Sequence, residues 1–139
     1  MTARTYWHLA ALGLLVGVCG CNTSGLVSAT GRLTYKNQPV PSTLVIFQPD
    51  DGSRRSTGVT DDDGNFKLRF SNSKDGVKPG HHTIYLRYEV SVEEETHQIP
   101  PKASRELKAV IARYGDPKKS PLHVDITESG QFIPIELDR

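Results

Sequence analysis

Cysteine is scarce in this sequence: only 2 of the 139 residues are Cys, and both precede residue 22. A disulfide framework or a thiol-based active site in the rest of the chain is therefore excluded. Positive charge is not in excess either, with 17 Lys+Arg against 16 Asp+Glu. Because a dedicated nucleic-acid binder needs a strongly basic surface, that class of protein is excluded as well.

Long apolar runs are also missing. The most apolar segment, residues 9–18, has about ten residues, whereas a transmembrane helix needs roughly 20. The overall apolar fraction of 36% and charged fraction of 24% are typical of globular proteins. The length favours one folded domain of ordinary size.

The N-terminal segment has the layout of a secretory signal: Arg4 precedes the apolar run, which ends in small residues. The four residues 18–21 (VCGC) resemble the bacterial lipobox, in which a small residue precedes the cysteine that receives diacylglycerol. We therefore predict a lipoprotein signal peptide over residues 1–20 and lipidation at Cys21. Cys19 is the competing acceptor, but the residue before it is the bulkier Val18.

A plain cleaved signal and a disulfide are the alternatives for the two cysteines, and a bridge between Cys19 and Cys21 would be strained. One acyl chain holds a protein at a membrane only marginally, so two or three chains would give a durable anchor. Residues 21–26 are small and polar and would form a lipidated tether. By resemblance to the sorting rules of some Gram-negative bacteria, a residue other than Asp directly after the acylated cysteine, here Asn22, favours the outer membrane.

Residues 27–139 contain the folded domain and are dominated by strand patterns. Apolar residues alternate with polar ones, or form short apolar runs, in residues 27–36, 43–48, 56–60, 66–70, 83–90, 122–127 and 132–137. Turn residues rich in Gly, Pro, Asn and Asp separate these segments. The spacing of about seven short strands predicts an all-β protein with an antiparallel β-sandwich.

One insertion, residues 91–121, interrupts the strands. Leu107, Val110, Ile111 and Tyr114 recur at helical spacing before Gly115, which predicts one short amphipathic helix before the last two strands. We expect its apolar stripe to cover an edge or end of the sandwich. Residues 101–120 contain six basic and two acidic residues. This excess of positive charge fits a surface that contacts anionic headgroups or glycans, and it equally fits a solvated helix face.

Several motifs resemble the carboxypeptidase regulatory-like domain, a transthyretin-like (prealbumin-type) β-sandwich. They are residues 31–40 (GRLTYKNQPV), 45–49 (VIFQP), 58–66 (GVTDDDGNF) and 78–80 (KPG). Residues 114–124 (YGDPKKSPLHV) are similar to small bacterial lipoproteins that carry the same domain. The resemblance implies an accessory module without an active site of its own, and fold analogy alone supplies no function.

The acidic stretch at residues 61–65 raises the possibility of calcium binding. An EF-hand alignment on Gly64 would put Val59 and Phe70 at ligand positions, which excludes an EF-hand. We expect a hairpin turn instead, in which aspartate side chains accept backbone hydrogen bonds and Gly64 adopts a positive φ.

The histidines do not have the spacing of a metal site. His81 and His82 are adjacent and would point to opposite faces of a strand, while His97 and His123 are far away in the sequence. We expect them to be ordinary surface residues. No Gly-x-Ser-x-Gly elbow occurs, and the signature tail of the transthyretin-like hydrolases is absent, so we predict no enzyme, no cofactor and no metal.

These patterns predict a cell-envelope lipoprotein, attached to the membrane through Cys21, that acts as a non-catalytic binding or structural module. The outer membrane is the favoured location, with the domain on its periplasmic or surface face. An envelope protein or a polysaccharide would be the partner, and nucleic acid would not. The alternative is an accessory subunit that docks on an envelope enzyme or transporter through the helix at residues 105–114.

Overall fold

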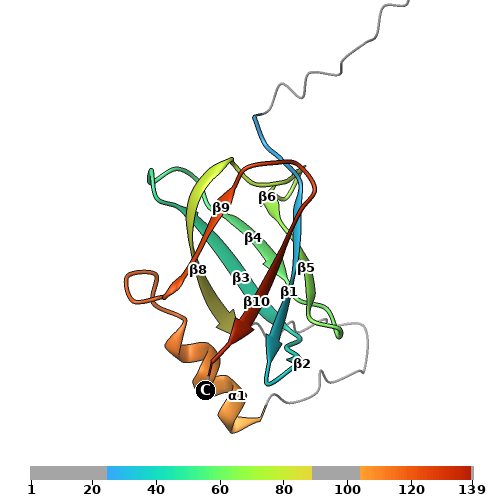
Figure 1. Ribbon diagram of the computed structural model, residues 1–139, viewed down its shortest axis with the longest axis vertical. Helices are drawn as coiled ribbons and strands as arrows, with labels where there is room; N and C mark the ends of the chain where they lie inside the picture. Colours follow the sequence, from blue (N-terminus) through green and yellow to red (C-terminus); the bar gives the residue numbers. More distant parts are fainter. Residues whose placement is uncertain (1–24, 89–103, 139) are drawn as a thin grey trace, which may run out of the picture.

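The computed structural model describes residues 25–88 and 104–138, which fold into two facing β-sheets and one helix (Figure 1). The β-sandwich predicted from the sequence is therefore confirmed. The lipidation site Cys21, the signal peptide at residues 1–20, most of the tether and His97 lie outside the described residues.

The four-stranded sheet is built around β1 (Ala29–Tyr35). Its neighbours are β10 (Gln131–Leu137) on one side, and β2 (Gln38–Pro39) and β5 (Asn65–Lys67) on the other. Every second residue of β1 is buried, from Ala29 to Tyr35, as the alternation predicts.

The six-stranded sheet has the order β7-β6-β4-β3-β8-β9. These strands are β3 (Thr43–Pro49), β4 (Ser56–Val59), β6 (Arg69–Ser71), β7 (Lys74–Asp75), β8 (Gly80–Tyr88) and β9 (Leu122–Ile126). The continuously apolar β3 pairs with both β4 and β8, which confirms it as a central strand.

The core lies between the two sheets. Phe47 of β3 and Leu86 of β8 are buried on one side, and Leu33 of β1 and Ile135 of β10 on the other. Burying a side chain of this size stabilises the fold by about 1.5–3 kcal/mol. The side chains of β3 and β4 that point away from this core form part of the outer surface of the six-stranded sheet.

Helix α1 (Arg105–Arg113) lies at one end of the sandwich, while the start of β1 lies at the opposite end (Figure 1). The Ser104 side chain caps the helix by accepting a hydrogen bond from Leu107 N at 3.1 Å. Val110 and Ile111 are buried, and the Tyr114 carbonyl accepts a hydrogen bond from Leu86 N at 2.9 Å. The helix therefore covers the end of the sandwich and part of the β8 edge, as predicted.

Two details differ from the sequence prediction. The β1–β10 pair is parallel, because the chain crosses from β9 in one sheet to β10 in the other instead of closing a hairpin. The segment at residues 66–70 is two strands rather than one, since the chain changes sheets at Leu68. With the short β2 and β7, this division raises the number of strands from about seven to ten in the part of the chain described.

Candidate functional site

An open hollow of about 660 Å³ lies on the outer face of the six-stranded sheet. Its floor is formed by Thr57 and Val59, the two outward-pointing residues of β4. Arg69 lies beside them because it pairs with Thr57 in the β4–β6 register. Arg54 and Arg55, which directly precede β4, complete the basic lining.

The loop that carries Arg54 and Arg55 is held in place by Asp51. The Asp51 carboxylate accepts hydrogen bonds from Lys78 Nζ at 2.6 Å and from Ser53 N at 2.9 Å. The hydrogen bond from Lys78 is the largest cause that holds the pKa of Asp51 well below its usual range, and the bond from Ser53 adds to it. Asp51 is therefore ionised and engaged with Lys78, and the loop presents the two arginines in a defined position.

The guanidinium groups of Arg54 and Arg55 contact neutral partners. Arg54 Nε donates to the Phe70 carbonyl at 2.9 Å, and its guanidinium carbon lies 5.5 Å from the centre of the Phe70 ring. Arg55 Nη1 donates to the Tyr85 hydroxyl at 3.4 Å. Neither arginine forms an ion pair with a carboxylate within residues 25–88 and 104–138.

Arg69 differs from the other two, because its Nε lies 3.4 Å from Asp75 Oδ1. None of the residues that line the hollow is acidic. Among the described residues, consequently, no carboxylate neutralises the positive charge of Arg54 and Arg55 at close range. Such a concave, basic surface attracts a ligand with negatively charged groups.

A second hollow of about 490 Å³ adjoins the first, since Val59 lines both. It lies beside Gly31 of β1 and Phe66 of β5, and Phe132 of β10 forms part of its wall. Val59 and Phe132 are the large apolar residues most open to solvent in the described chain, at 49% and 58% exposure. Exposed aromatic and aliphatic side chains in a hollow are typical of a binding surface.

A cluster of polar residues on β8 and β9 was missed by the sequence analysis. The antiparallel register pairs His81 with Asp125 and Thr83 with His123, all on the outer face. His81 Nδ1 makes a short hydrogen bond with Asp125 Oδ1, and the His81 and His123 rings lie nearly parallel with centres 6.1 Å apart. Thr83 donates to Asp50 Oδ1 at 3.1 Å, which joins the end of β3 to the cluster.

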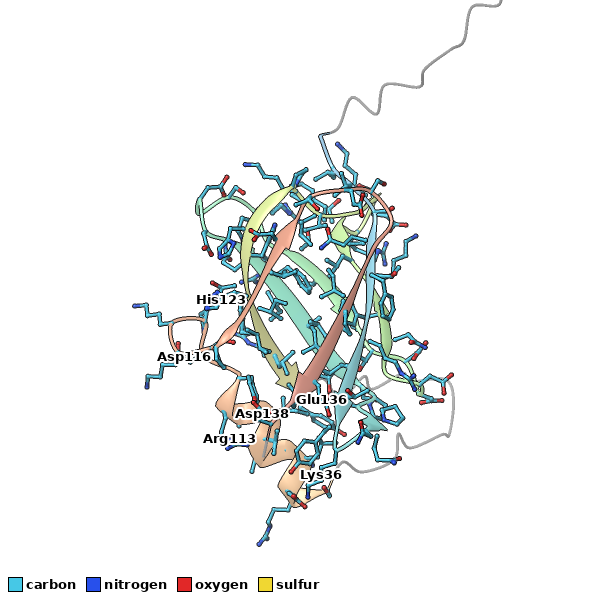
Figure 2. All side chains as sticks on the ribbon, in the orientation of Figure 1. Lys36, Arg113, Asp116, His123, Glu136 and Asp138 are labelled. Atoms are coloured by element: carbon cyan, nitrogen blue, oxygen red, sulfur yellow. The ribbon has the colours of Figure 1, made fainter. Side chains whose placement is uncertain are left out.

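The neighbouring carboxylates affect the protonation of His81. The hydrogen bond that Asp125 accepts from His81 and the negative charge of Asp125 raise the pKa of His81 above the ordinary histidine value, and Asp50 adds to the effect. His123 lies on the strand at the side of the sandwich in Figure 2. In the described part of the chain, no three His, Cys, Asp or Glu side chains are arranged to hold a metal ion.

His82 corrects one sequence prediction, because it is fully buried and not a surface residue. Its Nε2 lies 2.8 Å from the Lys78 carbonyl, and its ring packs beside Phe47. The prediction that His81 and His82 point to opposite faces is confirmed. His82 is buried because its side chain lies on the inner face of β8.

The turn at residues 61–65 is as predicted. Asp61 Oδ1 accepts hydrogen bonds from Asp63 N at 3.0 Å and Asn65 N at 2.8 Å, while Gly64 has a φ of 76°. The aspartate side chain therefore satisfies backbone donors of the turn.

The basic helix α1 lies at the end of the sandwich that is remote from the start of β1 (Figure 1). Figure 2 shows Lys36, Arg113 and Asp138 together at this end. Lys36 Nζ lies 2.7 Å from Glu106, and Arg113 donates to the Asp138 carbonyl at 3.0 Å. Among the residues described, no helix has the length and apolar character needed to cross a membrane.

No known family model matches the sequence, and no curated protein is found to be similar to it. One similar solved structure is that of a DUF3823 family protein from Parabacteroides merdae ATCC 43184. The similarity covers 81% of this chain at 12% identity, with a TM-score of 0.45. The chain spans 45% of the length of that protein.

Proposed function

We propose that this protein is a lipid-anchored module of the bacterial cell envelope that binds a partner without catalysing a reaction. Its sandwich is of the carboxypeptidase regulatory-like, transthyretin-like type. The anchor is the acylated Cys21, and the outer membrane is its location. The observation that carries the binding role is the basic hollow beside Arg54 and Arg55, where two guanidinium charges have no carboxylate partner within the described residues.

The geometry of the N-terminus supports attachment at one end of the domain. Residues 22–26 would reach at most about 3.3–3.6 Å per residue, so an anchor on Cys21 keeps the sandwich close to the bilayer. The start of β1 lies at the end opposite α1 (Figure 1). An anchor at that end leaves the outer face of the six-stranded sheet accessible, together with the hollow.

The anchor is tested with a Cys21→Ser variant of the full chain. We expect the variant protein to lack the acyl mass and its signal peptide to be cleaved less efficiently. We also expect the lipid-dependent partition into the detergent phase to be lost. Cys19→Ser is the matched control and should leave mass, processing and membrane partition unchanged. If Cys21→Ser behaves like the parent protein, or Cys19→Ser loses the lipid instead, the proposed anchor is wrong.

A second candidate function is that of an accessory subunit that docks on an envelope enzyme or transporter through α1. The observation that favours it is the position of the basic helix at the end away from the anchor, where Arg105 and Lys108 are exposed. Crosslinking of the full-length protein in intact membranes tests this role. One dominant protein captured by the parent and lost in an Arg105→Glu/Lys108→Glu variant would support it; unchanged capture would dismiss it.

A further inference from the structure

The two adjoining hollows differ in chemistry. The first presents Arg54 and Arg55, and the residues that line it include no Asp or Glu. The second is lined mainly by apolar surface, with Phe132 in its wall. Because Val59 belongs to both, a single extended ligand can contact the charged part and the apolar part at once.

We propose that these hollows form one groove for an acidic sugar chain, whose carboxylate or sulfate groups contact Arg54 and Arg55 while a neighbouring sugar ring packs on Phe132. This inference rests on the binding role proposed above and gives it a ligand class. A guanidinium group holds a planar carboxylate or a sulfate through paired N–H donors, which a neutral sugar does not offer.

The neutral residues of the groove fit a sugar chain. Ser53, Thr57 and Asn72 line the first hollow and carry donors and acceptors for hydroxyl groups. Phe132, at 58% exposure, offers an aromatic surface for the C–H face of a ring.

Other anionic polymers fit less well. Nucleic-acid binding depends on many phosphate contacts, whereas the chain has a formal net charge of only +1. Asp61 is among the residues that line the second hollow, which disfavours a polymer with a negatively charged group at every repeat. A sugar chain with one acidic group near Arg54 and Arg55, and an uncharged ring face beyond, matches this distribution of charge.

The test uses the full-length acylated protein in detergent and isothermal titration calorimetry. The carboxylate probe is a hyaluronan hexasaccharide, in which acidic and neutral sugars alternate, and its carboxyl methyl ester is the matched neutral control. A sulfated galactan hexasaccharide distinguishes sulfate from carboxylate as the acidic group. We expect at least one acidic probe to bind about tenfold or more tightly than the methyl ester, since hydrogen bonds to charged groups are the stronger kind.

The arginines are tested with an Arg54→Gln/Arg55→Gln variant. We expect about a tenfold or larger loss of affinity for the acidic probe, with the affinity for the methyl ester unchanged. An Arg105→Gln/Lys108→Gln variant is the matched control, because it removes the same charge from exposed positions on α1. Equal losses of affinity for the acidic probe in the two variants would mean that only the net charge of the protein matters, which would overturn the proposal.

The continuity of the groove is tested by ligand length. The hyaluronan hexasaccharide should bind more tightly than the hyaluronan disaccharide, and Phe132→Ala should remove most of that gain while leaving the affinity for the disaccharide unchanged. The exposed position of Phe132 makes a folding defect in this variant small. Equal affinity for the two lengths in the parent protein would contradict one continuous groove.

Absence of binding to both acidic probes would overturn the sugar proposal. That failure is distinguishable from failure of the proposed anchor, because the Cys21→Ser fractionation does not depend on any ligand. Binding of the methyl ester as tightly as the acid would show that Arg54 and Arg55 do not select the charge, which would also overturn the proposal.

Discussion

The side chain of Gln131 joins the edges of the two sheets through the backbone around Asp125. Its Nε2 donates to the Asp125 carbonyl at 2.8 Å, and its Oε1 accepts a hydrogen bond from Thr127 N at 3.0 Å. Gln131 starts β10 in one sheet, while Asp125 lies in β9, the edge strand of the other. The amide of Gln131 thus takes the place of a neighbouring strand at the end of β9.

Replacing Gln131 by Ala should lower the free energy of unfolding by about 1–2 kcal/mol, because two hydrogen bonds to backbone groups are lost. Urea denaturation of the purified variant measures the effect. Gln38→Ala is the matched control, since the Gln38 side chain is exposed; its effect on the free energy of unfolding should stay within about 0.5 kcal/mol. Equal stability of the two variants would contradict the role of Gln131.

The two glycines Gly64 and Gly52 form a second matched pair. Their φ angles are 76° and 73°, so an alanine is strained at both positions. A Cβ at Gly64 would lie 2.5 Å from the Leu33 carbonyl oxygen, whereas nothing lies within 4 Å of a Cβ at Gly52.

Gly52→Ala should therefore cost about 1 kcal/mol from backbone strain alone. Gly64→Ala should cost at least about 1 kcal/mol more, because the carbonyl of β1 must move. Thermal and urea unfolding of both variants measure the difference. Similar losses at the two positions would mean that the contact with Leu33 relaxes without cost.

Local patterns predicted much of this fold. Period-two alternation identified the buried faces of β1 and β10, and the spacing of Val110, Ile111 and Tyr114 identified α1 and its buried stripe. The Asp61–Gly64 turn also follows from local chemistry, because an aspartate side chain satisfies neighbouring backbone donors.

The pairing of distant segments was not predictable in the same way. The parallel β1–β10 pair depends on which sheet the chain enters after Gly130, and alternation within a strand is identical in either case. The groove has the same origin: Arg69 lies beside Arg54 and Arg55 only because Thr57 pairs with Arg69. The adjacent arginines before a strand were the one local signal of this site.

The N-cap of α1 gives another test of local chemistry. Ser104→Ala should remove the hydrogen bond from Leu107 N and cost about 1 kcal/mol of helix stability. Ser104→Asp keeps an acceptor at the cap and should preserve most of the stability. Hydrogen exchange of the α1 amides measures both; equal protection in Ser104→Ala and the parent protein would rule out a capping role.

The His81–Asp125 contact predicts a pH dependence on the outer face of the six-stranded sheet. Because the folded-state pKa of His81 is raised, its contribution to stability is fully present below the pKa of the unfolded chain. That contribution is lost as the pH rises through the higher folded-state value. NMR titration of the His81 ring should therefore give a pKa above about 6.5.

The Asp125→Asn variant should bring the pKa of His81 back toward the ordinary histidine value, because it removes the largest cause of the shift. The loss of stability on raising the pH from about 5 to about 9 should become smaller in this variant. Asp62→Asn, at an exposed position in the 61–65 turn, is the control that removes the same charge elsewhere. An unchanged His81 titration in Asp125→Asn would assign the shift to Asp50 and to the general field of the sheet, since Asp50 is the other carboxylate near the His81 ring.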